Sequence, residues 1–206
     1  MARAEERGTV SDPRSPAFDV VAIAASAGGL SALGEVLSAL PADFPAAIVI
    51  VQHLDPRHRS LMAEILSRRT SLQVKQAEDG DSLLPGTVYI APPDNHLLVN
   101  RNGTISLSHS ELVHFLRPSA DLMFDSVAAS YKDRAIAVVL TGSGKDGSLG
   151  VEAVKDMGGT VVVQDETSAE FPAMPSAAIE TGKVDFVLPL SEISSALVAL
   201  VVPAEA

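Results

Sequence analysis

Three short apolar runs, each followed at once by small or polar residues, constrain the fold of this chain more than any other feature. The runs are Val20–Ile23, Ile48–Val51 and Ala135–Leu140, and they are rich in Val, Ile and Ala. This composition is typical of strands that are buried on both faces of a parallel sheet. Ligands of open α/β sheets bind beyond the carboxyl ends of the strands. The residues that follow the three runs are therefore predicted to meet at one edge of one sheet.

The segments between these runs carry helical periodicity. Apolar residues from Leu30 to Leu40 recur at the spacing of one buried helix face, and Pro41 ends the pattern. Further helices are predicted over 60–69, 121–132, 147–157, 174–180 and 190–201, with Leu61 among the inward-facing residues. The alternation of these helices with short apolar runs predicts an α/β fold with a doubly wound, mostly parallel sheet.

A change of period marks an insertion in the middle of the chain. Residues 86–91, 96–100 and 104–108 are short β-type runs joined by turns, and Asn102-Gly103 is a strong hairpin signal. We expect an antiparallel hairpin here, at one edge of the sheet. Residues 1–16 are predicted to be a flexible leader, and residues 17–206 a single domain.

Composition excludes several classes of protein. The 206-residue chain has no cysteine, which excludes disulfides, thiolate zinc sites and cysteine nucleophiles. A formal net charge of −11 argues against a surface that neutralises nucleic-acid phosphates. Residues 1–16 contain no apolar signal-peptide core, and no apolar run reaches the ~18–20 residues of a membrane span. We expect a cytoplasmic protein that binds no nucleic acid and does not insert into a membrane.

Ser26 lies between a predicted strand and a predicted helix, among the small residues of the segment Ala24–Gly29. Small neighbours permit a sharp turn and the approach of a substrate, and a helix N-terminus favours an attacking or stabilised oxyanion. An ordinary helix cap and a phosphate-binding loop are the alternatives. The segment lacks G-x-G-x-x-G and a Walker lysine, and it does not match G-x-S-x-G because residue 24 is Ala.

His53 and Asp146 follow the other two apolar runs. A histidine at a strand end suits a general base, and an aspartate in a glycine-rich loop can orient it. The alternatives are a capping or surface histidine, and an aspartate that caps the helix beginning near Gly147. Four other histidines compete for the role of base, of which His96 and His109 are expected in turns or at the surface and His114 beside a substrate cleft; the fourth is His58.

A metal site is the weakest possibility. His53 and Asp55 have a spacing compatible with metal ligation, and His58 lies close by, but no further ligand is identifiable. We therefore expect no metal and no cofactor.

Taken together, six segments in this order resemble the catalytic domain of the chemotaxis protein-glutamate methylesterase family, CheB. The likeness covers about residues 18–190. The segments are IAASAGG at 23–29, VQH at 51–53, YIAPPDNH at 89–96, RPSAD at 117–121, LTGSGKDG at 140–147 and AMPSAAI at 173–179.

The resemblance implies a serine hydrolase with a doubly wound sheet and a Ser26, His53 and Asp146 triad. It implies hydrolysis of glutamate γ-methyl esters on the cytoplasmic helices of methylated chemoreceptors, and often deamidation of receptor glutamines. Backbone N–H groups near the nucleophile and in the glycine-rich loop are expected to stabilise the oxyanion, and Arg117 to contact the acidic substrate. The backbone groups belong to Ala27, Gly28, Gly142, Ser143 and Gly144.

The chain departs from the family pattern at three positions of these segments. Ala25 stands where glycine is usual, Ala27 where threonine is common, and Ser143 where methionine is common. The usual N-terminal phosphoacceptor domain is absent, which implies either ungated activity or control by a separate receiver or kinase protein. Two further functions stay open: a non-catalytic receptor-docking module of the same fold, and a small-molecule esterase.

Overall fold

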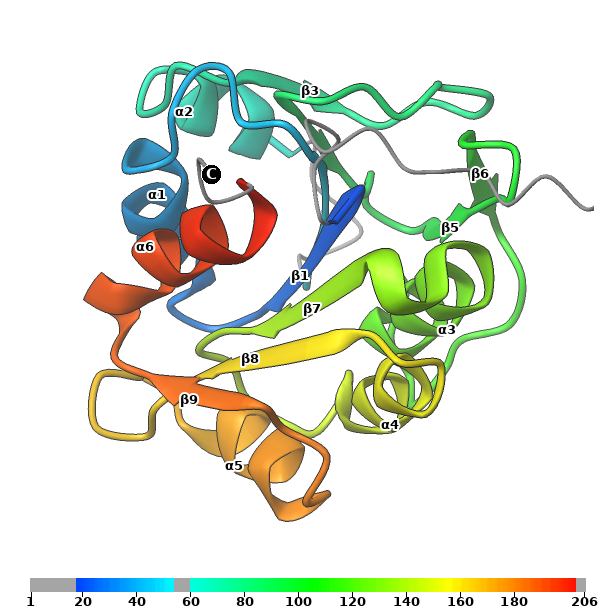
Figure 1. The fold of residues 1–206 in the computed structure, drawn as a ribbon. Helices are drawn as coiled ribbons and strands as arrows, with labels where there is room; N and C mark the ends of the chain where they lie inside the picture. The colour runs from blue at the N-terminus through cyan, green and yellow to red at the C-terminus, as the bar shows by residue number, and fades with distance from the viewer. Residues whose placement is uncertain (1–17, 54–59, 203–206) are drawn as a thin grey trace, which may run out of the picture.

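Seven parallel strands form the main sheet of the computed structural model, which describes residues 18–53 and 60–202 (Figure 1). The predicted leader therefore lies outside the described residues. The strands pair in the order β3-β4-β2-β1-β7-β8-β9. Their bounds are β1 (Val20–Ala25), β2 (Ala47–Gln52), β3 (Gln73–Gln76), β4 (Thr87–Ile90), β7 (Ala135–Val139), β8 (Thr160–Gln164) and β9 (Phe186–Leu188).

The three apolar runs of the sequence form buried parallel strands, as predicted, and the structure places them at the centre of the sheet. β1 pairs in parallel with β2 on one side and with β7 on the other. Every residue of these three strands is buried, because helices cover both faces. The chain builds the sheet outward from β1 first in one direction and then in the other, so the order reverses between β1 and β7. Such a switch point is where open α/β sheets bind their ligands.

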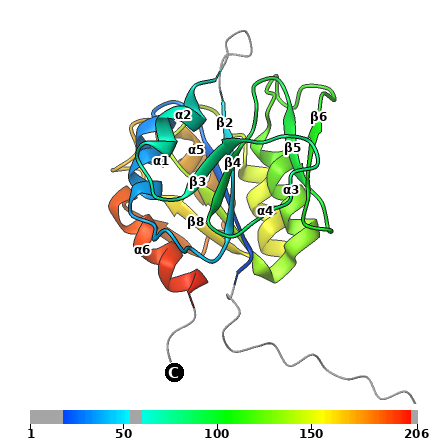
Figure 2. The same ribbon diagram turned by 90° about the horizontal axis from the view of Figure 1, so that it is seen from above.

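Helices cover the two faces in separate groups, and Figure 2 shows α1, α2 and α6 on one side and α3 and α4 on the other. The first group, α1, α2 and α6, packs on one face, and the second group, α3, α4 and α5, packs on the other. The helix bounds are α1 (Gly29–Ser38), α2 (Met62–Ser67), α3 (Ala120–Tyr131), α4 (Ser148–Asp156), α5 (Ala173–Glu180) and α6 (Leu190–Val201), and a short 3-10 helix, η1 (Lys132–Arg134), follows α3.

The predicted inward residues are mostly correct. Leu33, Val36 and Leu37 of α1 are fully buried, as their spacing requires. Leu61 is a wrong prediction, because it is 51% exposed. The short helix α2 begins one residue later, and it buries Met62 in addition to Leu66, which was predicted to face inward.

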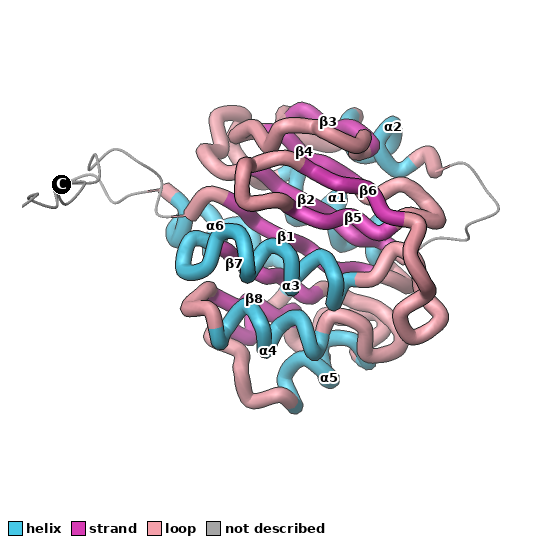
Figure 3. The backbone as a smooth tube through the Cα atoms, turned by 90° about the vertical axis from the view of Figure 1, so that its right-hand side faces the viewer, coloured by secondary structure: helices cyan, strands magenta, loops and turns pink. Residues whose placement is uncertain are grey.

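The predicted hairpin exists, but it forms a sheet of its own instead of extending the main sheet. β5 (His96–Val99) and β6 (Ile105–Ser108) pair antiparallel and lie beside α3 (Figure 3). The preceding run, predicted as part of this ribbon, is β4, which lies inside the main sheet between β3 and β2. All four residues of β4 are buried, which is typical of an interior parallel strand.

No helix among the described residues combines the length and apolar character needed to cross a bilayer.

Candidate active site

Ser26 and His53 lie next to each other at the carboxyl edge of the sheet. Ser26 follows β1 and His53 follows β2, and the last residues of these strands, Ala25 and Gln52, are paired in register. The His53 N–H donates to the Ala25 carbonyl at 3.2 Å. Neighbouring strands are ~4.8 Å apart, so the two residues occupy adjacent positions on the same edge.

The Gln52 side chain ties these two residues together. Its Nε2 donates to the Ser26 carbonyl at 2.7 Å and to the His53 carbonyl at 3.1 Å. The side chain is buried, with the whole residue only 6% exposed. Because one amide holds both backbones, Gln52 fixes their relative position. The motif VQH contains this residue, but no local pattern in it predicts the role.

The loop after β7 brings Asp146 to His53 across 93 residues of sequence. His53 Nε2 lies 2.8 Å from Asp146 Oδ2. The same oxygen accepts the Ala120 N–H at 2.6 Å, while Oδ1 accepts the Ser119 hydroxyl at 2.9 Å and the Asp121 N–H at 3.2 Å. Asp146 therefore sits at the positive N-terminus of α3, where a carboxylate is stabilised.

The alternative of Asp146 as the cap of its own following helix is wrong. The residue before α4 in the cap position is Gly147, and no side chain caps that helix end locally. Asp146 instead caps α3, whose N-cap residue Ser119 also accepts from the Leu122 N–H.

Asp146 is ionised in this environment. Burial opposes ionisation, but the hydrogen bonds from His53 and from the Ala120 N–H outweigh it and hold the pKa of Asp146 below its usual value. Since an ionised carboxylate can only accept, His53 Nε2 carries the proton of this hydrogen bond. The other ring nitrogen, Nδ1, is then left to accept a proton.

A second buried carboxylate, Asp121, mirrors this arrangement. Asp121 lies in the first turn of α3, yet its Oδ1 accepts the Gly147 and Gly150 N–H groups at the start of α4, both at 2.9 Å. The two helices thus exchange capping carboxylates. Burial, reinforced by the nearby Asp146 charge, raises the pKa of Asp121 to about 6.

Asp121→Asn is expected to change how stability depends on pH. A carboxyl whose folded pKa lies above its unfolded value binds a proton more tightly in the folded state, so the contribution of Asp121 to stability is lost as pH rises from about 4 to 6. The asparagine has no charge, and its Oδ1 can still accept both N–H groups. The free energy of unfolding of the variant, relative to wild type, should rise by roughly 2–3 kcal/mol across this window and stay level above it.

Urea unfolding at pH 4, 5, 6 and 7 measures this difference. A constant offset between wild type and Asp121→Asn at all four values would contradict the assignment of a raised pKa to Asp121.

His96 is fully buried, so its predicted place in a turn or at the surface is wrong. Its Nδ1 accepts the Ser119 N–H at 3.1 Å, which makes Nε2 the donor to the Glu111 carbonyl, also at 3.1 Å. Ser119 in turn donates to Asp146. His96 therefore positions Ser119, and Ser119 positions Asp146. No local sequence pattern predicts this long-range link.

His109 is the next of the competing histidines. His109 is exposed and its Nδ1 bonds to the Asp94 carbonyl, which agrees with its predicted surface position. His58 lies outside the described residues, as does Asp55. Within residues 18–53 and 60–202, no three His, Asp or Glu side chains form a group that could hold a metal ion.

One of the five predicted oxyanion donors is already engaged. The Gly142 N–H donates to the Phe171 carbonyl at 2.8 Å, so it is not a free donor. The N–H groups of the other four residues make no hydrogen bond within the described part of the chain; they belong to Ala27, Gly28, Ser143 and Gly144. Gly142 instead allows close packing, since a Cβ there would lie 2.8 Å from Ser26 Cβ.

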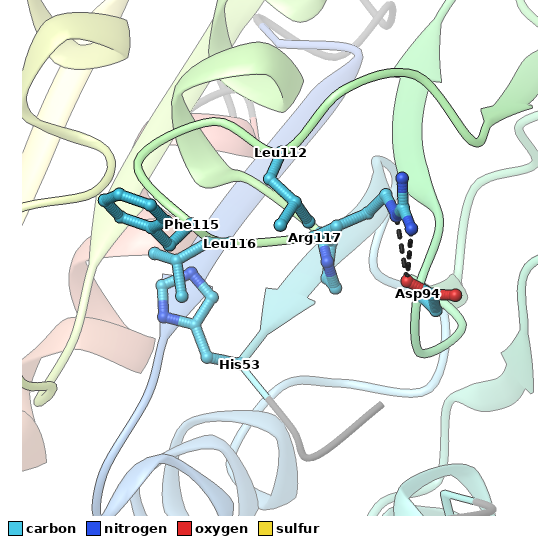
Figure 4. Close-up of a pocket in the computed structure, with 7 residues that line it drawn as sticks. His53, Asp94, Leu112, Phe115, Leu116 and Arg117 are labelled. Atoms are coloured by element: carbon cyan, nitrogen blue, oxygen red, sulfur yellow. Dashed lines mark hydrogen bonds and ion pairs between the residues drawn. The ribbon is translucent and has the colours of Figure 1, made fainter. Parts of the chain in front are cut away.

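Arg117 lines a hollow beside His53, but its guanidinium is held within the protein. Nε and Nη2 donate to Asp94 Oδ1 at 2.9 and 2.7 Å, and Nη1 donates to the Ser110 carbonyl at 2.6 Å. Figure 4 shows this pair at one side of the hollow, away from the His53 ring. The expected contact between Arg117 and an acidic substrate would have to break these bonds.

Ser26 opens into a different hollow from His53. The first, of about 360 Å³, is lined by Ser26, Gln52 and the start of α1; the second, of about 280 Å³, is lined by His53 and the segment 112–118. No hydrogen bond joins the Ser26 hydroxyl to the His53 ring in the described residues. The structure therefore brings together His53 and Asp146 directly, and Ser26 with His53 through adjacent backbone positions.

Comparison with known proteins identifies the family and the fold. The family model described as CheB methylesterase matches residues 21–197. The crystal structure of the Thermotoga maritima CheB methylesterase catalytic domain matches with a TM-score of 0.85 and 41% identity, covering 89% of this chain and 98% of that chain.

This chain spans a different share of each relative's length. A Leptospira interrogans protein is 40% identical over 183 residues, which are 89% of this chain and 95% of that protein. The "Protein-glutamate methylesterase/protein-glutamine glutaminase" of Moorella thermoacetica is 43% identical over 91% of this chain but only 45% of its own length. The extent of these matches shows that the chain belongs to the CheB methylesterase family.

Proposed function

We propose that this chain is a serine hydrolase that removes methyl esters from the glutamate γ-carboxyls of chemoreceptor helices. The observation that carries the proposal is the 2.8 Å hydrogen bond between His53 and Asp146. His53 lies beside Ser26 at the sheet edge, because the two residues follow the paired strand ends Gln52 and Ala25. Support comes from a relative of 43% identity whose name is protein-glutamate methylesterase/protein-glutamine glutaminase.

In this mechanism Ser26 is the nucleophile and His53 the general base. Rotation about the Cα–Cβ bond of Ser26 turns its hydroxyl toward His53 Nδ1, since catalytic hydrogen bonds are often formed only with substrate bound. Ser26 Oγ attacks the ester carbonyl carbon while its proton moves to Nδ1. Asp146 keeps the ring oriented through Nε2 and stabilises the imidazolium that forms.

The attack forms a tetrahedral intermediate, and two half-reactions then complete the hydrolysis. The carbonyl reforms, the bond to the methoxy oxygen breaks, and the imidazolium protonates the leaving group to give methanol. In the second half-reaction, His53 takes a proton from a water molecule, whose oxygen attacks the ester carbonyl carbon. The bond to Ser26 Oγ breaks, the imidazolium returns the proton to Oγ, and the glutamate carboxylate leaves the free enzyme. The unengaged N–H groups of Ala27 and Ser143 are suited to the oxyanion, each such donor lowering a barrier by ~3–4 kcal/mol.

Deamidation of glutamine follows the same steps with ammonia as the leaving group. The names of relatives from Moorella thermoacetica and Thermotoga maritima include protein-glutamine glutaminase. We include this second reaction in the proposal for the same three residues.

Methanol release from a methylated chemoreceptor cytoplasmic fragment tests the proposed function. We expect methanol in proportion to enzyme and time. Turnover of a small aryl ester without methanol release from the receptor would support a small-molecule esterase instead. Absence of both activities in a folded sample would support a non-catalytic docking module.

A further inference from the structure

A strained tight turn lies beside the proposed catalytic histidine. Val113 and Leu116 pair through two backbone hydrogen bonds, of 3.1 and 2.8 Å. The two residues between them, His114 and Phe115, have φ values of 49° and 66°. Turns of this kind normally take Asn or Gly, because a bulky side chain at positive φ is strained. Strain of this sort persists where the surroundings hold it, and it clusters at functional sites.

The turn presents an apolar surface to solvent at the mouth of the site. Phe115 is 94% exposed and Leu112 is 51% exposed. Both line the hollow of about 280 Å³ that also contains His53. Figure 4 shows Phe115 and Leu116 close to the His53 ring, with Leu112 further along the same wall. Single exposed apolar residues are ordinary, but adjacent ones around a reacting group indicate a contact surface.

The charges around this hollow favour a neutral ligand. Among its described lining residues, Arg117 is the one Lys or Arg, and Asp94 and backbone carbonyls occupy its donors. The chain as a whole has a net charge of −11, which disfavours an anionic ligand. A glutamate methyl ester is neutral and its carboxylate product is not, so an apolar wall holds the substrate better than the product.

We propose that Phe115, with Leu112, grips the apolar side chains that flank the esterified glutamate on a substrate helix and so places the ester beside His53. This inference rests on the proposed function and adds a specificity-determining contact to it. An amphipathic helix offers such side chains at a spacing of three or four residues, on the face that carries the ester. Recognition of the protein substrate by this wall is then apolar, without a contribution from Arg117.

The test is Phe115→Asn, with Phe115→Leu as the conservative variant. Asparagine tolerates positive φ, so the turn is kept while the apolar ring is lost. The measured quantity is the ratio of kcat/KM on the methylated receptor fragment to kcat/KM on p-nitrophenyl acetate. We expect this ratio to fall about tenfold, which is the loss typical of a residue near the centre of an interface. The fall should come chiefly from a higher KM for the receptor fragment. Phe115→Leu should keep most of the wild-type ratio, because it keeps an apolar side chain.

Phe186→Asn is the matched control. Phe186 is a partly exposed phenylalanine at the amino end of the edge strand β9, away from the carboxyl edge where His53 lies. This variant should leave the ratio unchanged. Thermal melting of each variant identifies any loss of folded protein.

Two results would overturn the inference. One is an unchanged kcat/KM on both substrates in Phe115→Asn, and the other is an equal fall on both; in either case the ratio stays the same, and the turn would have no part in recognition of the protein substrate. The outcome is separate from that of the proposed function, because Ser26→Ala reports on the nucleophile with either substrate. Methanol release that survives in Ser26→Ala would end the proposed function, whatever Phe115→Asn does.

Discussion

Ser26→Ala is expected to lower kcat for methyl-ester hydrolysis by about 10⁴- to 10⁶-fold. The alanine removes the only atom that the mechanism uses to form the covalent intermediate. The fold should be unaffected, because the contacts of Ser26 that the structure describes are made by its backbone: the N–H to the Thr141 carbonyl at 3.1 Å, and the carbonyl to Gln52 and the Gly29 N–H.

Methanol release under single-turnover conditions measures this loss, and the urea midpoint measures stability. Ser38→Ala, at the exposed end of α1, is the matched control and should keep full activity. A fall of less than tenfold in Ser26→Ala would move the nucleophile to another residue.

Asp146→Asn is expected to lower kcat by about 10⁴-fold, because an amide cannot hold the His53 ring in the required tautomer. The variant should also lose roughly 1–3 kcal/mol of unfolding free energy, since the asparagine NH₂ faces donors that the carboxylate accepted. These donors include the Ser119 hydroxyl and the Ala120 N–H.

The stability loss in Asp146→Asn has a predicted pH dependence. The folded pKa of Asp146 lies below its unfolded value, so its ionised form stabilises the protein above pH ~4 and this contribution disappears as pH falls through the folded pKa. The stability difference between wild type and variant should therefore shrink in acid. A difference that grew as pH fell would contradict the depressed pKa.

Asp185→Asn is the control that separates a catalytic role from the loss of a carboxylate that accepts a backbone N–H. Asp185 also accepts a backbone N–H, from Val161 at 2.8 Å, but at the amino end of the sheet. We expect it to lose stability while keeping kcat. If Asp146→Asn behaved in the same way, Asp146 would be a structural residue alone.

Much of the framework could be predicted from local patterns. Continuous runs of Val, Ile and Ala identified β1, β2 and β7, because burial on both faces leaves no place for polar residues. The closing helix predicted over residues 190–201 is α6, and its observed bounds are Leu190–Val201. The edge position of Ser26, His53 and Asp146 then followed from the rule that loops at the carboxyl ends of parallel strands meet.

The supporting contacts of the site could not be predicted, because they join residues that are distant in sequence. The burial of His96 depends on the hairpin packing against α3, and the exchange of Asp121 and Asp146 depends on two helix ends that lie side by side. The hairpin itself was expected, but its separation from the main sheet depends on β4 entering the sheet interior. Local periodicity carries no information about such placements.

Covalent labelling with a serine-directed fluorophosphonate is the most direct test of the central claim that His53 and Asp146 activate Ser26. Peptide mass spectrometry should find one adduct, on Ser26, with labelling absent in Ser26→Ala and at least a hundredfold slower in Asp146→Asn. An adduct on a different serine, or a labelling rate on Ser26 that Asp146→Asn leaves unchanged, would contradict the account.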